Sequence, residues 1–219
     1  MNVSNRLLEQ LIKQYNDVFL SRLDFHLQFY VNKNLDEVLE GASYALTPTE
    51  NGKAPKKHPH QWRLSKETLD NVKEKLSQNN IKTKLEELRS KREKDGFEKV
   101  YQLIRDTIYP IKGVGPLMVY DTALRIGAGL NLYPQNYLYV QQGAQEGLKN
   151  LLNINSKKIA ISLISPSPVS KLSAYHLGNF LCIYRDGKLK LVEDCIKGYY
   201  DQPEDPEEVE KEKRRNIWY

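Results

Sequence analysis

The residues best placed to do chemistry lie in a short turn, residues 111–115 (IKGVG), between two segments with helical periodicity. Gly113 and Gly115 allow a positive φ or a close approach of the backbone to another group. Pro116 follows directly, and proline suits the first turn of a helix, where an N–H has no intrahelical partner. The free N–H groups at a helix N-terminus attract anions, and Lys112 adds a cation beside them. The turn therefore predicts a phosphate-binding site.

Two amphipathic helices are expected to flank this turn, because apolar residues recur at helical spacing on both sides of it. Those of the first helix are Phe97, Val100, Ile104 and Ile108, and those of the second are Leu117, Tyr120, Leu124 and Ala128. Gly127 and Gly129 are expected to end the second helix. Asp121 and Arg125, four residues apart on it, are expected to form a surface ion pair.

The helix, turn and helix over residues 97–129 resemble the helix-hairpin-helix element, which binds DNA without sequence specificity. The alternating apolar and glycine residues at 111–115 carry this resemblance. It implies that the partner is duplex DNA and that carbonyl groups of the turn hold a monovalent cation, which bridges to the phosphate. The residues also leave open an ordinary corner between two helices, in which the glycines only permit a sharp turn.

Residues 97–152 further resemble the DNA glycosylase superfamily, whose members are mostly α-helical and flip a damaged base into a cleft. Bifunctional members carry a nucleophilic lysine just after the hairpin, where this chain has residues 116–118 (PLM). Nearly all members place an aspartate in a later V-D-T-H-like run, where this chain has Gln141 or Gln142. Because glutamine is not a carboxylate, it supplies neither a general base nor charge stabilisation.

We therefore predict a non-sequence-specific DNA-binding protein with no catalytic residue and no further cofactor. Two alternatives stay open. One is a divergent DNA glycosylase or lyase that uses another acid. The other is a protein-interaction module that presents a tyrosine-rich face to a protein partner.

Residues 47–64 are expected to form a basic loop, because proline, glycine and polar residues dominate and no period is visible. Its cations, interleaved with His58, His60 and Trp62, would give a second contact with a nucleic-acid backbone and an aromatic ring for a base. The alternative is a solvated loop with Trp62 in the core. No cysteine or carboxylate lies beside the histidines, so we predict no metal site. The predicted nucleic-acid-binding residues are Lys112, Gly113, Val114, Gly115, Lys53, Lys56, Lys57 and Arg63.

Composition is that of a globular protein, since 40% of residues are hydrophobic and 28% are charged. The net charge is +5, but residues 201–219 carry seven acids and four bases, so the rest of the chain carries +8. A basic body suits an anionic partner. The two cysteines, Cys182 and Cys195, form no CxxC pattern and are expected to be free thiols. With no apolar run long enough for a bilayer and no secretory signal, we expect a cytoplasmic protein without membrane contact.

The predicted fold is mostly α: a multi-helix orthogonal bundle that contains the helix-hairpin-helix element and a small irregular or β C-terminal appendage. Ser4, Asn34, Ser65 and Ser173 are expected to be helix N-caps. The predicted segments are N-terminal helices at 1–46, the basic loop at 47–64, a helical region at 65–152, the appendage at 153–200 and an acidic tail at 201–219.

Some details of the segments are also expected. Gly143 and Gly147 predict close packing of their helix against another backbone. His26 lies on the apolar stripe of residues 4–31 and is expected to be a satisfied, partly buried histidine rather than a ligand. Residues 158–164 are expected to form a short strand or an extended buried arm. A helix over residues 174–184 is preferred to a β-hairpin turning at Asp186 and Gly187.

Overall fold

The computed structural model describes residues 4–49, 54–58, 61, 63–164 and 168–190, and over these residues it is mostly helical, with two small antiparallel sheets. The predicted helical class is therefore confirmed. The acidic tail, Lys53, His60, Trp62 and Cys195 lie outside the described residues. Among the helices of the described part of the chain, none has both the length and the apolar character needed to cross a membrane.

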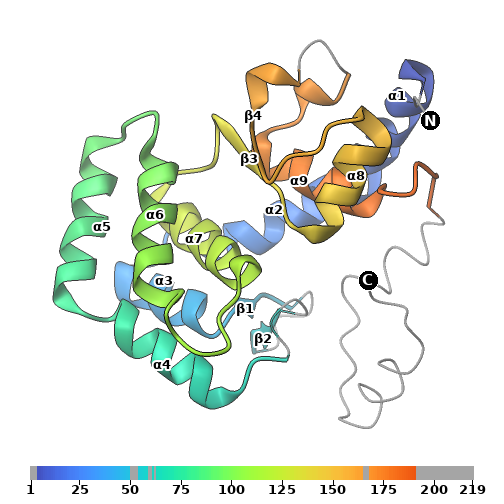
Figure 1. Ribbon diagram of the computed structural model, residues 1–219. Coiled ribbons are helices and arrows are strands. Elements are labelled where there is room, and N and C mark those ends of the chain that lie inside the picture. Colours follow the sequence, from blue (N-terminus) through green and yellow to red (C-terminus); the bar gives the residue numbers. More distant parts are fainter. Residues whose placement is uncertain (1–3, 50–53, 59–60, 62, 165–167, 191–219) are drawn as a thin grey trace, which may run out of the picture.

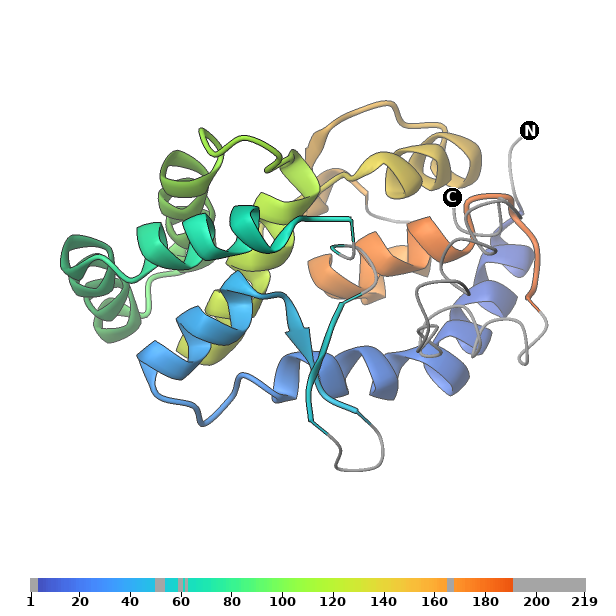
Figure 2. The same ribbon diagram turned by 90° about the horizontal axis from the view of Figure 1, so that it is seen from below.

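One hydrophobic core is built around helix α7, which lies at the centre of the molecule (Figures 1 and 2). The helices that form this core are α3 (Leu35–Ser43), α4 (Lys66–Leu76), α5 (Asn79–Lys91), α6 (Gly96–Ile108) and α7 (Pro116–Leu130). The apolar stripe predicted for α6 is buried throughout. Helix α7 is buried on nearly every side, because α3, α6 and α2 (Ser21–Gln28) all pack against it.

A second core joins the N-terminal helix to the later part of the chain. Its helical segments are α1 (Asn5–Tyr15), the π-helical η1 (Asn16–Leu20), α2 (Ser21–Gln28), α8 (Gln142–Leu152), the 3-10 turns η3 (Ile161–Leu163) and η4 (Pro168–Lys171), and α9 (Ala174–Ile183). Helix α8 packs on α9, and α1 packs on η4. The stretch expected as a small appendage thus supplies much of this core.

The two sheets each pair short strands. Strand β1 (Leu46–Thr47) pairs with β2 (Lys56–Lys57), with Leu46 opposite Lys57. Strand β3 (Tyr137–Tyr139) pairs with β4 (Lys158–Ala160), with Leu138 opposite Ile159. The region predicted as an unstructured basic loop is therefore closed at its base by a β-hairpin, which crosses α2 in Figure 2.

Several local predictions are confirmed by the helix ends. The side chains of Ser4, Asn34, Ser65 and Ser173 each accept a backbone N–H as N-caps, and Asn34 forms a capping box with Glu37. The preferred helix over residues 174–184 is present as α9, and residues 158–160 form a strand. The expected end of α7 is wrong, because the helix continues to Leu130 and ends at Asn131 in the left-handed conformation.

The glycines of α7 serve packing rather than termination. A Cβ on Gly127 would lie 2.4 Å from the Leu132 carbonyl oxygen, and one on Gly129 would lie 2.5 Å from Val38 Cγ2. Since real Cβ atoms do not approach other atoms so closely, glycine is what lets α3 and the chain after α7 come this near. The helix remains continuous because packing outweighs the weak helix propensity of glycine.

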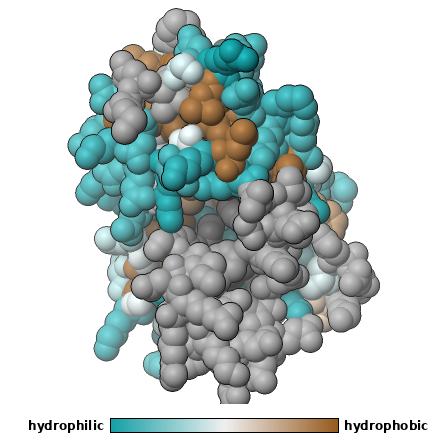
Figure 3. Space-filling view, turned by 90° about the vertical axis from the view of Figure 1, so that its right-hand side faces the viewer, coloured by the Kyte–Doolittle hydropathy of each residue, from teal (hydrophilic) through white to brown (hydrophobic). Residues whose placement is uncertain are grey.

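On the face that carries α1, apolar side chains form a small patch among hydrophilic ones (Figure 3). The large apolar side chains exposed in the described part of the chain are those of Phe25, Tyr109, Tyr137, Leu163 and Leu189. Single exposed apolar residues are usual on soluble proteins and carry no functional meaning by themselves.

A replacement of Gly147 by alanine should destabilise the second core. A Cβ at this position would lie 2.0 Å from the Leu181 carbonyl oxygen, so the backbones of α8 and α9 would have to separate. We expect Gly147→Ala to lower the free energy of unfolding by at least about 2 kcal/mol, measured by urea titration.

Gly178→Ala provides the control on the same helix pair. Its Cβ would meet Leu138 Cδ1 at 3.4 Å, an ordinary contact. The substitution should raise stability by about 0.5–1 kcal/mol through helix propensity. Equal losses in both variants would show that close packing at Gly147 is not the cause.

His176 connects α9 to the N-terminal helices. Its Nδ1 lies 2.9 Å from the Tyr15 hydroxyl and its Nε2 lies 3.0 Å from Asp24 Oδ1. Burial lowers the pKa of His176, and the nearby Asp24 carboxylate opposes that shift without cancelling it. The neutral ring is thus favoured in the folded protein.

Stability should fall in acid because of His176. The unfolded chain, in which the histidine pKa is about 6.5, binds a proton more readily than the folded chain. The stabilisation that comes from holding His176 neutral is therefore complete above about pH 6.5. It is lost as the pH falls toward the lower pKa that His176 has in the folded protein. Urea titrations at about pH 7.5 and 5.5 give the free energy of unfolding at each pH. Between these two values His176→Gln should lose less of it than wild type, and the difference should be at most about 1.4 kcal/mol per pH unit. Equal losses would contradict this assignment.

Candidate functional site

The turn between α6 and α7 reaches the surface. Gly113 has a φ of +93°, a conformation that L side chains rarely adopt, so the predicted need for glycine is met there. Lys112 and Gly113 are exposed. Val114 is buried, and its N–H donates to the Ile111 carbonyl at 3.0 Å, so this amide is already used within the turn.

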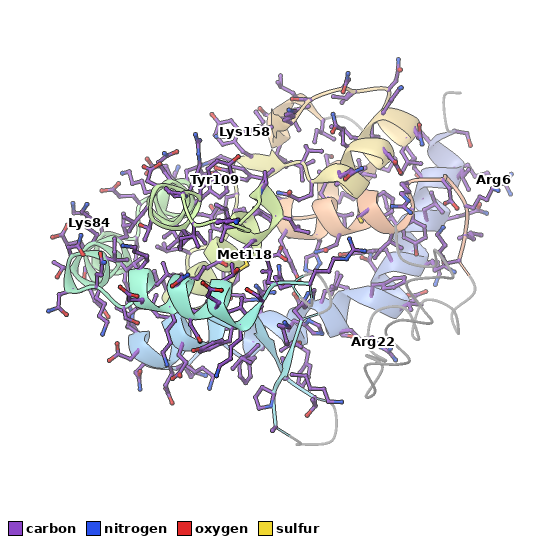
Figure 4. All side chains as sticks on the ribbon, turned by 60° about the horizontal axis from the view of Figure 1, so that its bottom comes forward. Arg6, Arg22, Lys84, Tyr109, Met118 and Lys158 are labelled. Carbon is purple, nitrogen blue, oxygen red and sulfur yellow. The ribbon has the colours of Figure 1, made fainter. Side chains whose placement is uncertain are left out.

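Helix α7 begins at this turn without a side-chain cap. Gly115 is its N-cap in an extended conformation, Pro116 is the first helical residue, and the first turn contains no acidic residue. The first helical hydrogen bond runs from the Val119 N–H to the Gly115 carbonyl at 3.1 Å. The N–H groups of Leu117 and Met118 therefore have no partner within the helix. Figure 4 shows Met118 where α7 begins, with Tyr109 at the end of α6.

The start of α4 lies beside the same turn. A Cβ built on Gly113 would lie 3.2 Å from Thr68 Oγ1, and Thr68 in turn is hydrogen-bonded to the N-cap Ser65 at 3.0 Å. Lys66, the first residue of α4, is exposed, and so is Glu67 next to it. The turn thus contributes Lys112, and the neighbouring helix start contributes both Lys66 and an acidic side chain.

The basic loop at residues 47–64, predicted as a second contact with nucleic acid, packs against the fold more than expected. Lys56 and Lys57 are half-buried on β2, and the ammonium of Lys57 donates to the Leu64 carbonyl at 3.0 Å. Burial lowers the pKa of Lys57. Arg63 is exposed just before α4. Of these loop cations, Lys57 holds the segment that leads into α4 rather than pointing to solvent.

The expected ion pair between Asp121 and Arg125 is present, but it is largely buried rather than on the surface. Arg125 is only 6% exposed, and its Nη2 lies 3.9 Å from Asp121 Oδ2. Gln61 lies between them: its Nε2 donates to Asp121 Oδ2 at 2.5 Å, and its Oε1 accepts from Arg125 Nη2 at 3.1 Å. Because α7 is enclosed, this face of the helix meets protein instead of water.

Asp121 and Arg125 line a cavity of about 50 Å³ at the junction of α2, β1, α7 and α9. His26 and His58 contribute their rings, which meet edge to face with centroids 5.6 Å apart. The residues that line the cavity include Leu27, Tyr30, Leu46, Thr47, His26, His58, Asp121, Leu124, Arg125, Tyr175 and Asn179. Sequence reasoning missed this site. The spacing of Asp121 and Arg125 was the available signal, whereas nothing in the sequence marked Gln61.

His26 and Tyr30, which line this cavity, also make hydrogen bonds within the fold. His26 is half-buried and its Nδ1 lies 3.2 Å from Thr47 Oγ1, which confirms a satisfied histidine. The Tyr30 hydroxyl donates to the Leu46 carbonyl at 2.5 Å, and burial raises its pKa to about 12. Within the described residues, no three His, Cys, Asp or Glu side chains are arranged to hold a metal ion.

The tyrosines near the turn mostly pack inward. Tyr120 and Tyr139 are buried and contact the Phe97 ring edge to face, so they belong to the core. Tyr137 is exposed, with the Lys158 ammonium 4.0 Å from its ring centroid.

Gln141 and Gln142, the two glutamines discussed in the sequence analysis, lie at the start of α8, where Gln141 is the N-cap.

Comparisons of the chain with protein families, with curated proteins and with solved structures found no match.

Proposed function

We propose that this protein binds the sugar-phosphate backbone of duplex DNA through residues 111–116, without reading base sequence and without catalysis. The observation that supports this most directly is the exposed, uncapped start of α7 beside the exposed Lys112. Backbone N–H groups and the helix dipole both favour an anion at such a position. A phosphate oxygen would accept from the N–H groups of Leu117 and Met118.

The shape of the turn adds to this argument. Gly115 has no atom within 4 Å of the position that a Cβ would take, so the space before α7 is open. Because the body of α7 is anchored in the core, its first turn is held in place before any ligand arrives. Such preorganisation reduces the entropy lost on binding. Residues 1–200 also carry a positive net charge, which favours a polyanion.

A divergent glycosylase or lyase has one observation in its favour. Asp121 is a carboxylate that lines a cavity about 8 Å along α7 from its first residue. However, a cavity of 50 Å³ holds about three or four waters, whereas a flipped base has about eight or more non-hydrogen atoms. The cavity is thus smaller than the pocket that base excision requires, and binding without catalysis is the stronger proposal.

Reversing the charge of Lys112 should weaken DNA binding without unfolding the protein, because the side chain is exposed. We expect Lys112→Glu to reduce affinity for a duplex about tenfold near 0.1 M salt, and to lower the slope of log K against log salt by about 1 or more. Fluorescence anisotropy over a salt series measures both quantities. Lys84→Glu is the matched control, since this exposed lysine lies on α5, away from the start of α7 (Figure 4).

A second variant should separate binding from stability at the same turn. In Gly115→Asp, the new carboxylate would cap α7 and occupy the proposed phosphate position, so affinity should fall while stability is kept or rises by a few tenths of a kcal/mol. Gly115→Ala, which adds a methyl group in open space, should retain more of the affinity. Wild-type binding by both Lys112→Glu and Gly115→Asp would refute the turn as the contact.

A further inference from the structure

The cavity at the junction of α2, β1, α7 and α9 contains a buried cation whose hydrogen-bonding capacity is not used up. Arg125 is 6% exposed, and its Nη1 is buried with no hydrogen-bond partner. Its Nη2 donates to Gln61 at 3.1 Å, while the Asp121 carboxylate lies 3.9 Å away, beyond hydrogen-bond distance. A buried charged donor without an acceptor is unfavourable. Arg125 is one of the residues that line the cavity, so an acceptor bound there would lie beside its guanidinium.

We propose that this cavity binds phosphate, either inorganic phosphate or the terminal phosphate of a monoester, with Arg125 as its anchor. This site is separate from the α6–α7 turn and does not depend on DNA binding there. A guanidinium is suited to oxyanions because its planar donors match two oxygens at once. The volume of 50 Å³, which corresponds to about three or four waters, suits a ligand of about five non-hydrogen atoms.

The other groups in the cavity favour phosphate over sulfate or a carboxylate. Asp121 lines the same cavity, and an ionised carboxylate only accepts hydrogen bonds. Phosphate near neutral pH keeps a proton on one oxygen, so it can accept from Arg125 and donate to an acceptor. Sulfate and simple carboxylates are fully ionised there and offer no donor. Thr47 and His26 also line the cavity, where they are hydrogen-bonded to each other.

Access to the cavity comes from its rim. His26, Tyr175 and Asn179 are half-buried, so the lining reaches the molecular surface between α2 and α9. A phosphate bound there would contact elements from both hydrophobic cores, because Leu27 and Leu124 belong to the first and Leu23 to the second. Binding should therefore raise the stability of the whole fold.

The test is the melting temperature of this chain in sodium phosphate and in sodium sulfate at equal ionic strength. At a phosphate concentration about 100 times Kd, the melting temperature should rise by about 5–10 °C, and sulfate should give a much smaller rise. Arg125→Met should abolish the phosphate effect. Because it removes the ion-pair partner of the largely buried Asp121, it should also lower the melting temperature without phosphate, so the shift caused by phosphate is the quantity compared. Arg105→Met, at an exposed position on α6, should respond like wild type.

Three results would overturn the proposal: no rise with phosphate, an equal rise with sulfate, or an undiminished rise in Arg125→Met. Should Arg125→Met fail to fold, the comparison of phosphate with sulfate on wild type decides the question. Lys112→Glu should keep the phosphate effect, so this proposal and the proposed DNA binding can fail separately.

A second arm identifies the source of the phosphate. It compares a short duplex with 5′-phosphate ends and the same duplex with 5′-hydroxyl ends. A greater rise with the phosphorylated duplex, absent in Arg125→Met, assigns the cavity to a monoester end. Equal rises, together with the effect of inorganic phosphate, assign it to the free anion.

Discussion

The enclosure of α7 is the constraint on which the rest of the structure depends. Helices α2, α3 and α6 cover it, and the contact with α3 is possible only because residue 129 is glycine. A helix in this position can expose only its ends, and its C-terminal end is closed by Asn131 and the chain that follows. Its N-terminal turn is the part that reaches solvent. The proposed phosphate-binding function is thus located at the end of α7 where backbone N–H groups have no partner within the helix.

The same enclosure explains the cavity. Asp121 and Arg125 are polar residues on a helix that has almost no solvent-facing side, so their partners must come from other elements. Gln61, from the segment after β2, supplies both a donor and an acceptor. It leaves one nitrogen of Arg125 unpaired, and α2 and α9 close the space around it. A polar space of this kind forms because two hydrophobic cores meet without excluding the charged groups between them.

The two proposed anion sites differ in their electrostatics. Contacts at an exposed turn are screened by salt, so binding there should be strongly dependent on ionic strength. A guanidinium that is 6% exposed is screened much less, and it selects its ligand by hydrogen-bond geometry and by fit. The turn suits a long polyanion that makes many weak contacts, whereas the cavity suits one small anion.

Local patterns in the sequence determined much of the secondary structure. The N-caps at Ser4, Asn34, Ser65 and Ser173, the buried stripe of α6 and the glycine at a positive φ in the turn all follow from spacing and from backbone sterics, which act over a few residues. The close approach at Gly147 was also predictable, although its partner on α9 was not.

What only the tertiary structure decided is which surfaces face water. The spacing of Asp121 and Arg125 is that of a solvated ion pair, and Gly127 reads as a helix end. The pair does form, but it is largely buried, and the helix continues past Gly127, because segments distant in the sequence cover α7. Local periodicity identifies the apolar face of a helix. It does not show which of the other faces will also pack against protein, since that depends on contacts between residues far apart in the chain. The turn could be proposed as a phosphate site from the sequence, whereas the cavity exists only through those long-range contacts.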